Sequence, residues 1–99
     1  MKWADYCITK VKHDNDFIHV ESVLTQEDLG EKFGETSVLT RKELINAIRK
    51  GKSFVTITLG NHGWNKGQLV EIIKIKGKEY LKVRPEDATR DNLGVLPEF

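Results

Sequence analysis

The chain has 99 residues, enough for one small domain but not for two, so a single domain is expected over residues 1–99. Its hydrophobic content of 38% and charged content of 31% suit a soluble globule, and no apolar run approaches the roughly 20 residues of a membrane span. Residues 1–39 carry four Lys and eight Asp or Glu, residues 40–84 carry eleven Lys or Arg and three Glu, and residues 85–99 carry one Arg and four acidic residues. This basic middle indicates either a surface for polyanions or acidic ends that fold over it.

The first third of the sequence predicts a β-hairpin followed by a loop. Residues 6–12 are rich in β-branched and aromatic side chains, which is typical of a strand, and residues 17–24 are the expected return strand. Between them, residues 13–16 are of types that favour turns. Residues 25–38 show no regular period, so we expect a loop with a short edge strand near Thr36–Val38, pinned to the core by Phe33.

Residues 40–51 combine several signals of a helix. Thr40 and Glu43 have the spacing of a capping box, in which each side chain accepts a hydrogen bond from the backbone N–H of the other residue. Leu44 and Ile48 lie on one apolar stripe at helical spacing. Gly51 supplies the left-handed residue that ends a helix.

Three further strands are predicted over residues 52–59, 69–75 and 79–83, with Gly77 in the turn between the last two. Residues 60–67 hold three glycines and two asparagines, so we expect a loop there. The resulting order β-β-α-β-β-β predicts an α+β fold: a small antiparallel sheet of about five strands with one helix packed on it. A partly open barrel is the alternative.

The last nine residues, Asp91–Phe99, contain the apolar side chains Leu93, Val95, Leu96 and Phe99. Chain ends are usually polar and frayed. Burying each of these side chains would gain roughly 1.5–3 kcal/mol, so we expect the tail to pack against the rest of the protein.

This ending resembles that of the domain-of-unknown-function family 3892, a group of short, mostly bacterial proteins. The segments Arg41–Ile48, Gly63–Gly67 and Glu79–Leu81 fit the same family, and the resemblance covers nearly the whole chain. The family is uncharacterised, so the resemblance implies almost nothing about function.

The glycine-rich segment at residues 60–67 is the leading candidate for a binding site. It places Trp64 beside Asn61, His62, Asn65 and Lys66. Trp64 could stack on a partner, with Lys66 meeting a phosphate or a carboxylate. The alternative is that Trp64 folds back on the sheet as a lid over the core.

The last predicted hairpin offers a second candidate surface, rich in basic residues. In a strand, residues two apart share a face, so Lys74 aligns with Lys76, and Tyr80 aligns with Lys82 and Arg84. If exposed, these side chains form a basic ribbon with one aromatic residue, as nucleic-acid-binding proteins use. The alternative is an ordinary solvated face with lysines that protect an edge strand.

No catalytic, metal-binding or cofactor-binding motif is recognisable. His13 with Asp14 and Asp16 would bind a cation weakly at best, and their spacing fits a turn better than a calcium loop. Cys7 is expected to be a buried thiol, and a single cysteine favours a reducing cytoplasm. We therefore expect a non-enzymatic binding or adaptor module without a cofactor or a membrane association. A protein is the favoured partner, and nucleic acid is the alternative.

Overall fold

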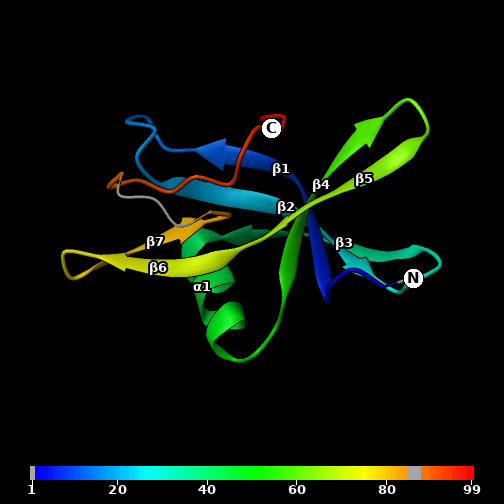
Figure 1. The fold of residues 1–99 in the computed structure, drawn as a ribbon, viewed down its shortest axis with the longest axis horizontal. Coiled ribbons are helices and arrows are strands. Elements are labelled where there is room, and N and C mark those ends of the chain that lie inside the picture. The colour runs from blue at the N-terminus through cyan, green and yellow to red at the C-terminus, as the bar shows by residue number, and fades with distance from the viewer. Residues whose placement is uncertain (1, 85–87) are drawn as a thin grey trace.

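The structure is a computed structural model that describes residues 2–84 and 88–99 (Figure 1). The described residues form one helix and seven strands, which confirms the predicted α+β class. In chain order the elements are β1 (Tyr6–His13), β2 (Val20–Asp28), β3 (Phe33–Thr40), α1 (Arg41–Arg49), β4 (Phe54–Gly60), β5 (Gly63–Leu69), β6 (Glu71–Ile75) and β7 (Lys78–Lys82).

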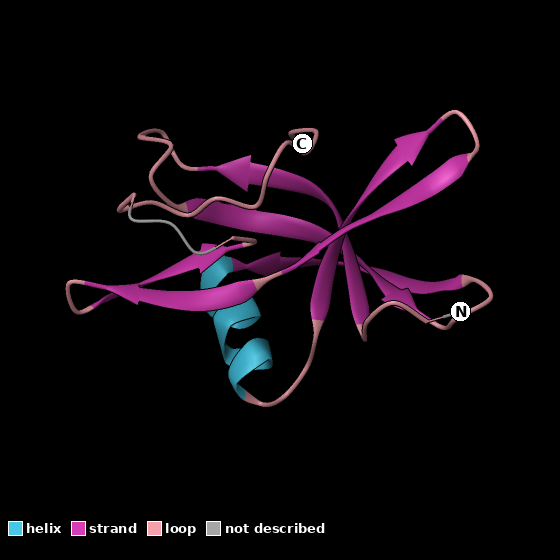
Figure 2. Cartoon of the chain, viewed as in Figure 1, coloured by secondary structure: helices cyan, strands magenta, loops and turns pink. Residues whose placement is uncertain are grey.

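Five strands form one sheet in the order β3-β2-β1-β4-β5, and β6 pairs with β7 in a separate hairpin (Figure 2). The sheet does not close into a barrel. Neighbouring strands are antiparallel except β1 and β4, which run parallel with Tyr6 opposite Phe54. An entirely antiparallel sheet was the wrong prediction, because helix α1 connects β3 to β4 and returns the chain in the direction of β1.

Residues 25–38, predicted to form a loop, instead belong mainly to two paired strands, the end of β2 and most of β3. β2 continues to Asp28 and β3 begins at Phe33, so the edge strand expected near Thr36–Val38 is longer than predicted. Thr25 lies opposite Ser37, and its hydroxyl donates to the Ser37 carbonyl at 3.1 Å. β3 is an edge strand with no fully buried side chain, so it lacks the apolar alternation that reveals a strand in a sequence.

Helix α1 begins at the predicted capping box. The Glu43 N–H donates to the Thr40 hydroxyl at 3.2 Å, and the Thr40 N–H donates to Glu43 Oε1 at 2.9 Å. Gly51 follows the helix with a φ of 96°, as a left-handed terminating residue should. Leu44 and Ile45 are buried and carry the helix onto the main core.

The sheet has apolar clusters on both faces. The main core joins the sheet to α1 and to the β6–β7 hairpin, and includes Ile8, Leu44, Phe54 and Leu81. A smaller cluster contains Ala4, Cys7, Val55 and Ile57, with Trp3 and Phe33 packed against it. In the part of the chain that the structure describes, no helix is long and apolar enough to cross a membrane.

The C-terminal tail packs on the body only in part. Leu93 is 3% exposed and belongs to the main core, and Leu96 packs against that core. Val95 is 96% exposed and Phe99 is 42% exposed, so the expectation that all four side chains would be buried was wrong for these two. Isolated bridges to β1 and β7 fix the tail's path and leave these two side chains facing solvent.

Asp91, at the start of the tail, joins three other elements. Its side chain is fully buried and accepts hydrogen bonds from the backbone N–H groups of Val20 and Leu81, each at 2.8 Å. The Arg41 guanidinium, at the start of α1, also donates to both carboxylate oxygens, at 2.7 and 3.2 Å. The tail is thereby attached to β2, β7 and α1 through one carboxylate.

Candidate binding site at the β4–β5 hairpin

The segment predicted as a glycine-rich loop is a β-hairpin. β4 ends at Gly60 and β5 begins at Gly63, so only residues 61 and 62 lie between the strands. Gly63 has a φ of 111°, which residues with a side chain rarely adopt. The loop prediction was wrong because glycine and asparagine mark a turn without showing that the flanking residues pair. Here Leu59 lies opposite Trp64.

Gly67 allows β5 to approach β4 closely. A Cβ atom at this position would lie 2.3 Å from the Thr56 hydroxyl oxygen and 2.6 Å from the Thr56 carbonyl oxygen. The Gln68 N–H donates to the same hydroxyl at 3.1 Å. The close approach coincides with a register shift between Val55 and Ile57, and irregularities of this kind re-aim the side chains of a strand.

Trp64 is supported on one side and open on another. Its ring meets the ring of Phe33 edge to face, with the centroids 5.9 Å apart and the planes at 89°. Trp64 nevertheless remains 37% exposed. It is therefore neither a buried lid nor an unsupported side chain, because its ring packs on Phe33 while part of its surface is available to a ligand.

A pocket of about 180 Å³ lies beside this aromatic pair. Its lining consists of Trp3, Asp28, Gly30, Glu31, Lys32, Phe33 and Trp64. The N-terminal segment, the β2–β3 turn and the β4–β5 hairpin thus contribute to one site, and Figure 1 shows the N-terminal segment beside the β2–β3 turn. Three of the lining residues are large aromatics, which makes the pocket mainly apolar.

Asp28, the last residue of β2, is the buried polar group of this pocket and is 4% exposed. Its Oδ2 accepts hydrogen bonds from the Trp3 and Ala4 N–H groups at 2.7 and 3.3 Å, and its Oδ1 accepts from the Gly30 N–H at 2.9 Å. Burial raises the pKa of Asp28, but these hydrogen bonds outweigh it, so the pKa lies below its ordinary value. Asp28 is therefore ionised at neutral pH.

The charge of Asp28 is held by dipoles rather than by a cation. Within residues 2–84 and 88–99, no Lys, Arg or His nitrogen lies within 4.0 Å of its carboxylate oxygens. The thiol of Cys7 donates to Oδ2 at 3.8 Å. Burial, then the charge of Asp28, raises the pKa of Cys7 to about 12, so the thiol is neutral. The prediction of a buried thiol at Cys7 is confirmed.

A second pocket, of about 440 Å³, also includes Trp64. The rest of its lining is Thr9, Lys10, Leu24, Gln26, Thr58, Leu59 and Pro97. Leu59 is 71% exposed, which leaves a large apolar side chain in solvent. Gln26 Oε1 is buried and has no hydrogen-bond partner among the described residues.

The other predicted residues of the hairpin lie outside both pockets. Asn61, His62, Asn65 and Lys66 are all exposed, and none lines either pocket that contains Trp64. Their part in binding stays a prediction.

The predicted basic ribbon on the last hairpin is interrupted. Lys74, Lys76 and Arg84 are exposed, but Tyr80 is 5% exposed and Lys82 is fully buried. The condition that Tyr80, Lys82 and Arg84 share an exposed face is therefore not met by the first two.

The reason is that the face of β7 carrying Tyr80 and Lys82 is covered, while Leu81 on the other face lies in the main core. The tail forms a bridge to Lys82 through Asn92, and the Lys82 ammonium donates to the Ala88 carbonyl. The Tyr80 ring stacks on His19, with the ring centroids 6.2 Å apart. A two-residue period in sequence shows which side chains share a face, but it does not show which face is covered.

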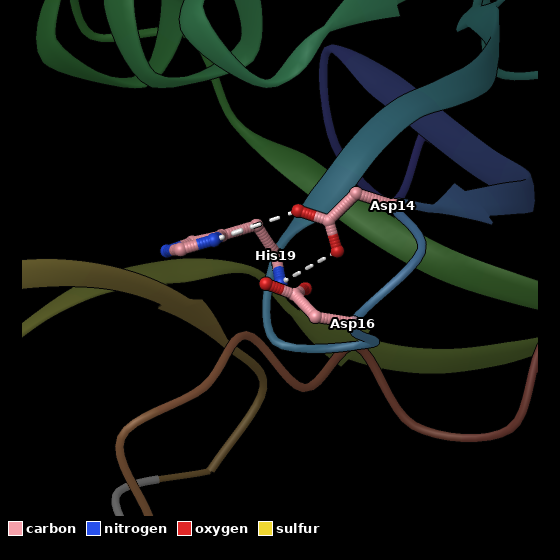
Figure 3. A group of neighbouring side chains, drawn as sticks. All are labelled: Asp14, Asp16 and His19. Atoms are coloured by element: carbon pink, nitrogen blue, oxygen red, sulfur yellow. Dashed lines mark hydrogen bonds and ion pairs between the residues drawn. The ribbon is translucent and has the colours of Figure 1, made fainter.

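Asp14, Asp16 and His19 form a further polar group in the turn between β1 and β2 (Figure 3). One ligand-type atom from each lies within 4.8 Å of the others. The His19 and Ile18 N–H groups donate to Asp14 and Asp16, at 3.4 and 2.9 Å. These bonds are those of a turn, in agreement with the sequence interpretation, although His19 rather than His13 joins the two aspartates.

Sequence reasoning missed Trp3, Asp28 and Glu31 as members of the site. Phe33 was recognised only as a contact with the core. Trp3 and Trp64 are far apart in the chain, so only the fold shows that they line one pocket. The available signal was the acidic stretch over residues 27–35, which holds four acidic residues and one lysine.

The chain belongs to the family described as protein of unknown function DUF3892, whose model matches residues 6–97. No curated protein and no solved structure matches the chain. The family assignment agrees with the resemblance seen in the sequence and does not name an activity.

Proposed function

We propose that this protein is a non-enzymatic module that binds a segment of another protein at Trp64. The observation that carries this proposal is that Trp64, a partly exposed tryptophan, lines two pockets at once. Tryptophan is enriched among the residues that dominate binding energy at protein interfaces, particularly where it borders well-formed pockets.

The surroundings of Trp64 fit a peptide better than a compact small molecule. The larger pocket exposes Leu59, a large apolar side chain that a bound peptide would cover. β5, which carries Trp64, is an edge strand of the sheet. An extended segment lying along this edge would reach both pockets.

A protein partner is better supported than nucleic acid. Tyr80 and Lys82, two of the residues expected to meet nucleic acid, are buried. Beside Trp64 the smaller pocket contains the acidic residues Asp28 and Glu31, which would repel phosphates. A cytoplasmic location, which we propose with this function, is supported by the lone, buried cysteine.

A display selection of random short peptides on the full chain tests the function. We expect enriched peptides that bind the wild type and bind Trp64→Ala at least about tenfold more weakly, because truncating a central interface tryptophan usually costs more than 1.4 kcal/mol. Affinities are measured by fluorescence anisotropy of the labelled peptides. Trp64→Ala should fold, because the side chain is only partly buried.

Val38→Ala is the matched control. Val38 lies on β3, at the opposite edge of the sheet, is 55% exposed and lines neither pocket that contains Trp64. It should bind the selected peptides as the wild type does. Peptides that bind wild type and Trp64→Ala equally well, or a selection without enrichment, would refute the proposed site.

A further inference from the structure

We infer that the pocket formed by Trp3, Phe33 and Trp64 holds the side chain of an arginine from the partner protein. This inference rests on the proposed function and adds the chemistry of the anchoring residue. Three features of the pocket carry it: its aromatic walls, its buried carboxylate and the acidic residue in its lining.

The aromatic walls suit a weakly hydrated cation. Phe33 and Trp64 meet edge to face, so the two rings present surfaces in different directions, and Trp3 contributes a third ring from the N-terminal segment. The faces of aromatic rings attract cations, and tryptophan does so most strongly. A guanidinium is planar, stacks on such rings and sheds water more readily than an ammonium. The pocket volume of about 180 Å³ leaves room for one such side chain.

The buried carboxylate supplies a fixed negative charge. Asp28 is ionised and is held by backbone N–H groups and a thiol, with no Lys, Arg or His among the described residues within ion-pair distance. A buried charge is usually paired, since its desolvation is costly. A cation entering the pocket would balance this charge in a setting of low dielectric, where the attraction is strong.

The remaining polar lining adds one charge of each sign. Glu31 is exposed, so its carboxylate is free to form the two parallel hydrogen bonds that a guanidinium offers. Lys32 is also exposed and is the cation of the lining. Its positive charge repels a cationic ligand. Removing the charge of Lys32 should therefore strengthen binding of an arginine, whereas removing the charge of Glu31 should weaken it.

The test is a titration followed by ¹H–¹⁵N NMR on the 99-residue chain. The chain has two tryptophans, and both line the pocket, so the indole N–H signals of Trp3 and Trp64 report directly on it. The probes are N-acetyl-arginine-methylamide and N-acetyl-citrulline-methylamide, which have nearly the same shape and differ in charge. We expect both indole signals to shift, with the arginine probe binding at least about fivefold more tightly.

Two variants test the electrostatic part without disturbing the buried network. Glu31→Gln should weaken binding of the arginine probe and Lys32→Gln should strengthen it, each by about twofold at low salt, because both charges are partly screened by solvent. Both variants should change binding of the uncharged citrulline probe less than they change binding of the arginine probe. The inference is overturned by equal affinity for the two probes, or by opposite or absent effects of the variants. Tighter binding of tetramethylammonium than of the arginine probe would also overturn it.

Failure of this inference is distinguishable from failure of the proposed function. Peptides from the display selection that depend on Trp64 but contain no enriched arginine would refute the arginine assignment and leave the binding module intact. A selection without Trp64-dependent peptides would refute the module itself, whatever the small probes do.

Discussion

Asp28, at the end of β2, and Asp91, at the start of the tail, are two buried aspartates that are satisfied in different ways. Both accept hydrogen bonds from backbone N–H groups. Asp91 also receives the guanidinium of Arg41, whereas Asp28 has no such partner among the described residues and faces a pocket. The charge of Asp91 is balanced by Arg41, and the carboxylate joins the tail to β2, β7 and α1. The carboxylate of Asp28 is held by backbone N–H groups and lines the pocket that we propose to bind an arginine.

The comparison predicts that removing the charge of Asp91 has the larger effect on stability. Asp91→Asn replaces one acceptor oxygen by an NH₂ group and leaves Arg41 half-buried without its counterion. We expect the free energy of unfolding to fall by about 3–5 kcal/mol, as when one partner of a buried ion pair is removed. Urea denaturation followed by far-UV circular dichroism measures it. A loss below about 1 kcal/mol would show that this carboxylate does not hold the elements together.

Asp28→Asn should cost less, because none of the described cations pairs with Asp28 and would lose its counterion. We expect a loss of about 1–3 kcal/mol from the unsatisfied backbone N–H groups at neutral pH. The pKa of Asp28 is lowered in the fold, so its ionised form stabilises the protein above its ordinary pKa of about 4, and this contribution is lost as the pH falls through the folded value. The stability difference between wild type and variant should therefore shrink below about pH 4. A difference that grows in acid would contradict this.

Thr40→Ala tests whether the helix start positions Arg41 for Asp91. Loss of the hydroxyl that accepts from the Glu43 N–H should cost about 1 kcal/mol, the usual effect of removing an N-cap side chain. If the cap also orients Arg41, the combined loss in Thr40→Ala with Asp91→Asn should be smaller than the two single losses together. Strict additivity in urea denaturation would show that cap and ion pair act independently.

Val95→Ser should give the smallest change in the free energy of unfolding. It is a control for the contribution of exposed apolar side chains in the tail. Val95 is 96% exposed, although it lies only four positions from Asp91. Its replacement should change the free energy of unfolding by less than about 0.5 kcal/mol. A larger loss would mean that the tail is stabilised by its apolar side chains in general rather than by Asp91 and Leu93.

Local signals in the sequence predicted the local structure well. The capping box at Thr40 and Glu43 and the terminating Gly51 fixed α1, since such signals act within one turn of the chain. The edge strand expected near Thr36–Val38 was placed too short, because β3 has no fully buried side chain and lacks a clear apolar alternation. The burial of Lys82 and the exposure of Val95 depend on how the tail crosses β7 and β1, which no local pattern records.

The candidate site was half predicted for the same reason. Trp64 stood out because a large aromatic among glycines is conspicuous in a sequence. Trp3 and Asp28 did not stand out, because their roles arise only when the N-terminal segment meets the β2–β3 turn, through the bonds from the Trp3 and Ala4 N–H groups to Asp28. Long-range hydrogen bonds of this kind leave no period in the sequence.

The parallel contact between β1 and β4 has a consequence for how the chain reaches its native state. The β1–β2 and β2–β3 pairs join neighbours in sequence, whereas Tyr6 meets Phe54 only after two strands and the helix have intervened. Closing so long a loop costs conformational entropy before the stabilising contacts between β1 and β4 can form. Folds rich in contacts between distant residues therefore fold slowly. The N-terminal meander is therefore expected to form first, and the arrival of β4, which brings Trp64 to Phe33, to be the late step that completes the pocket.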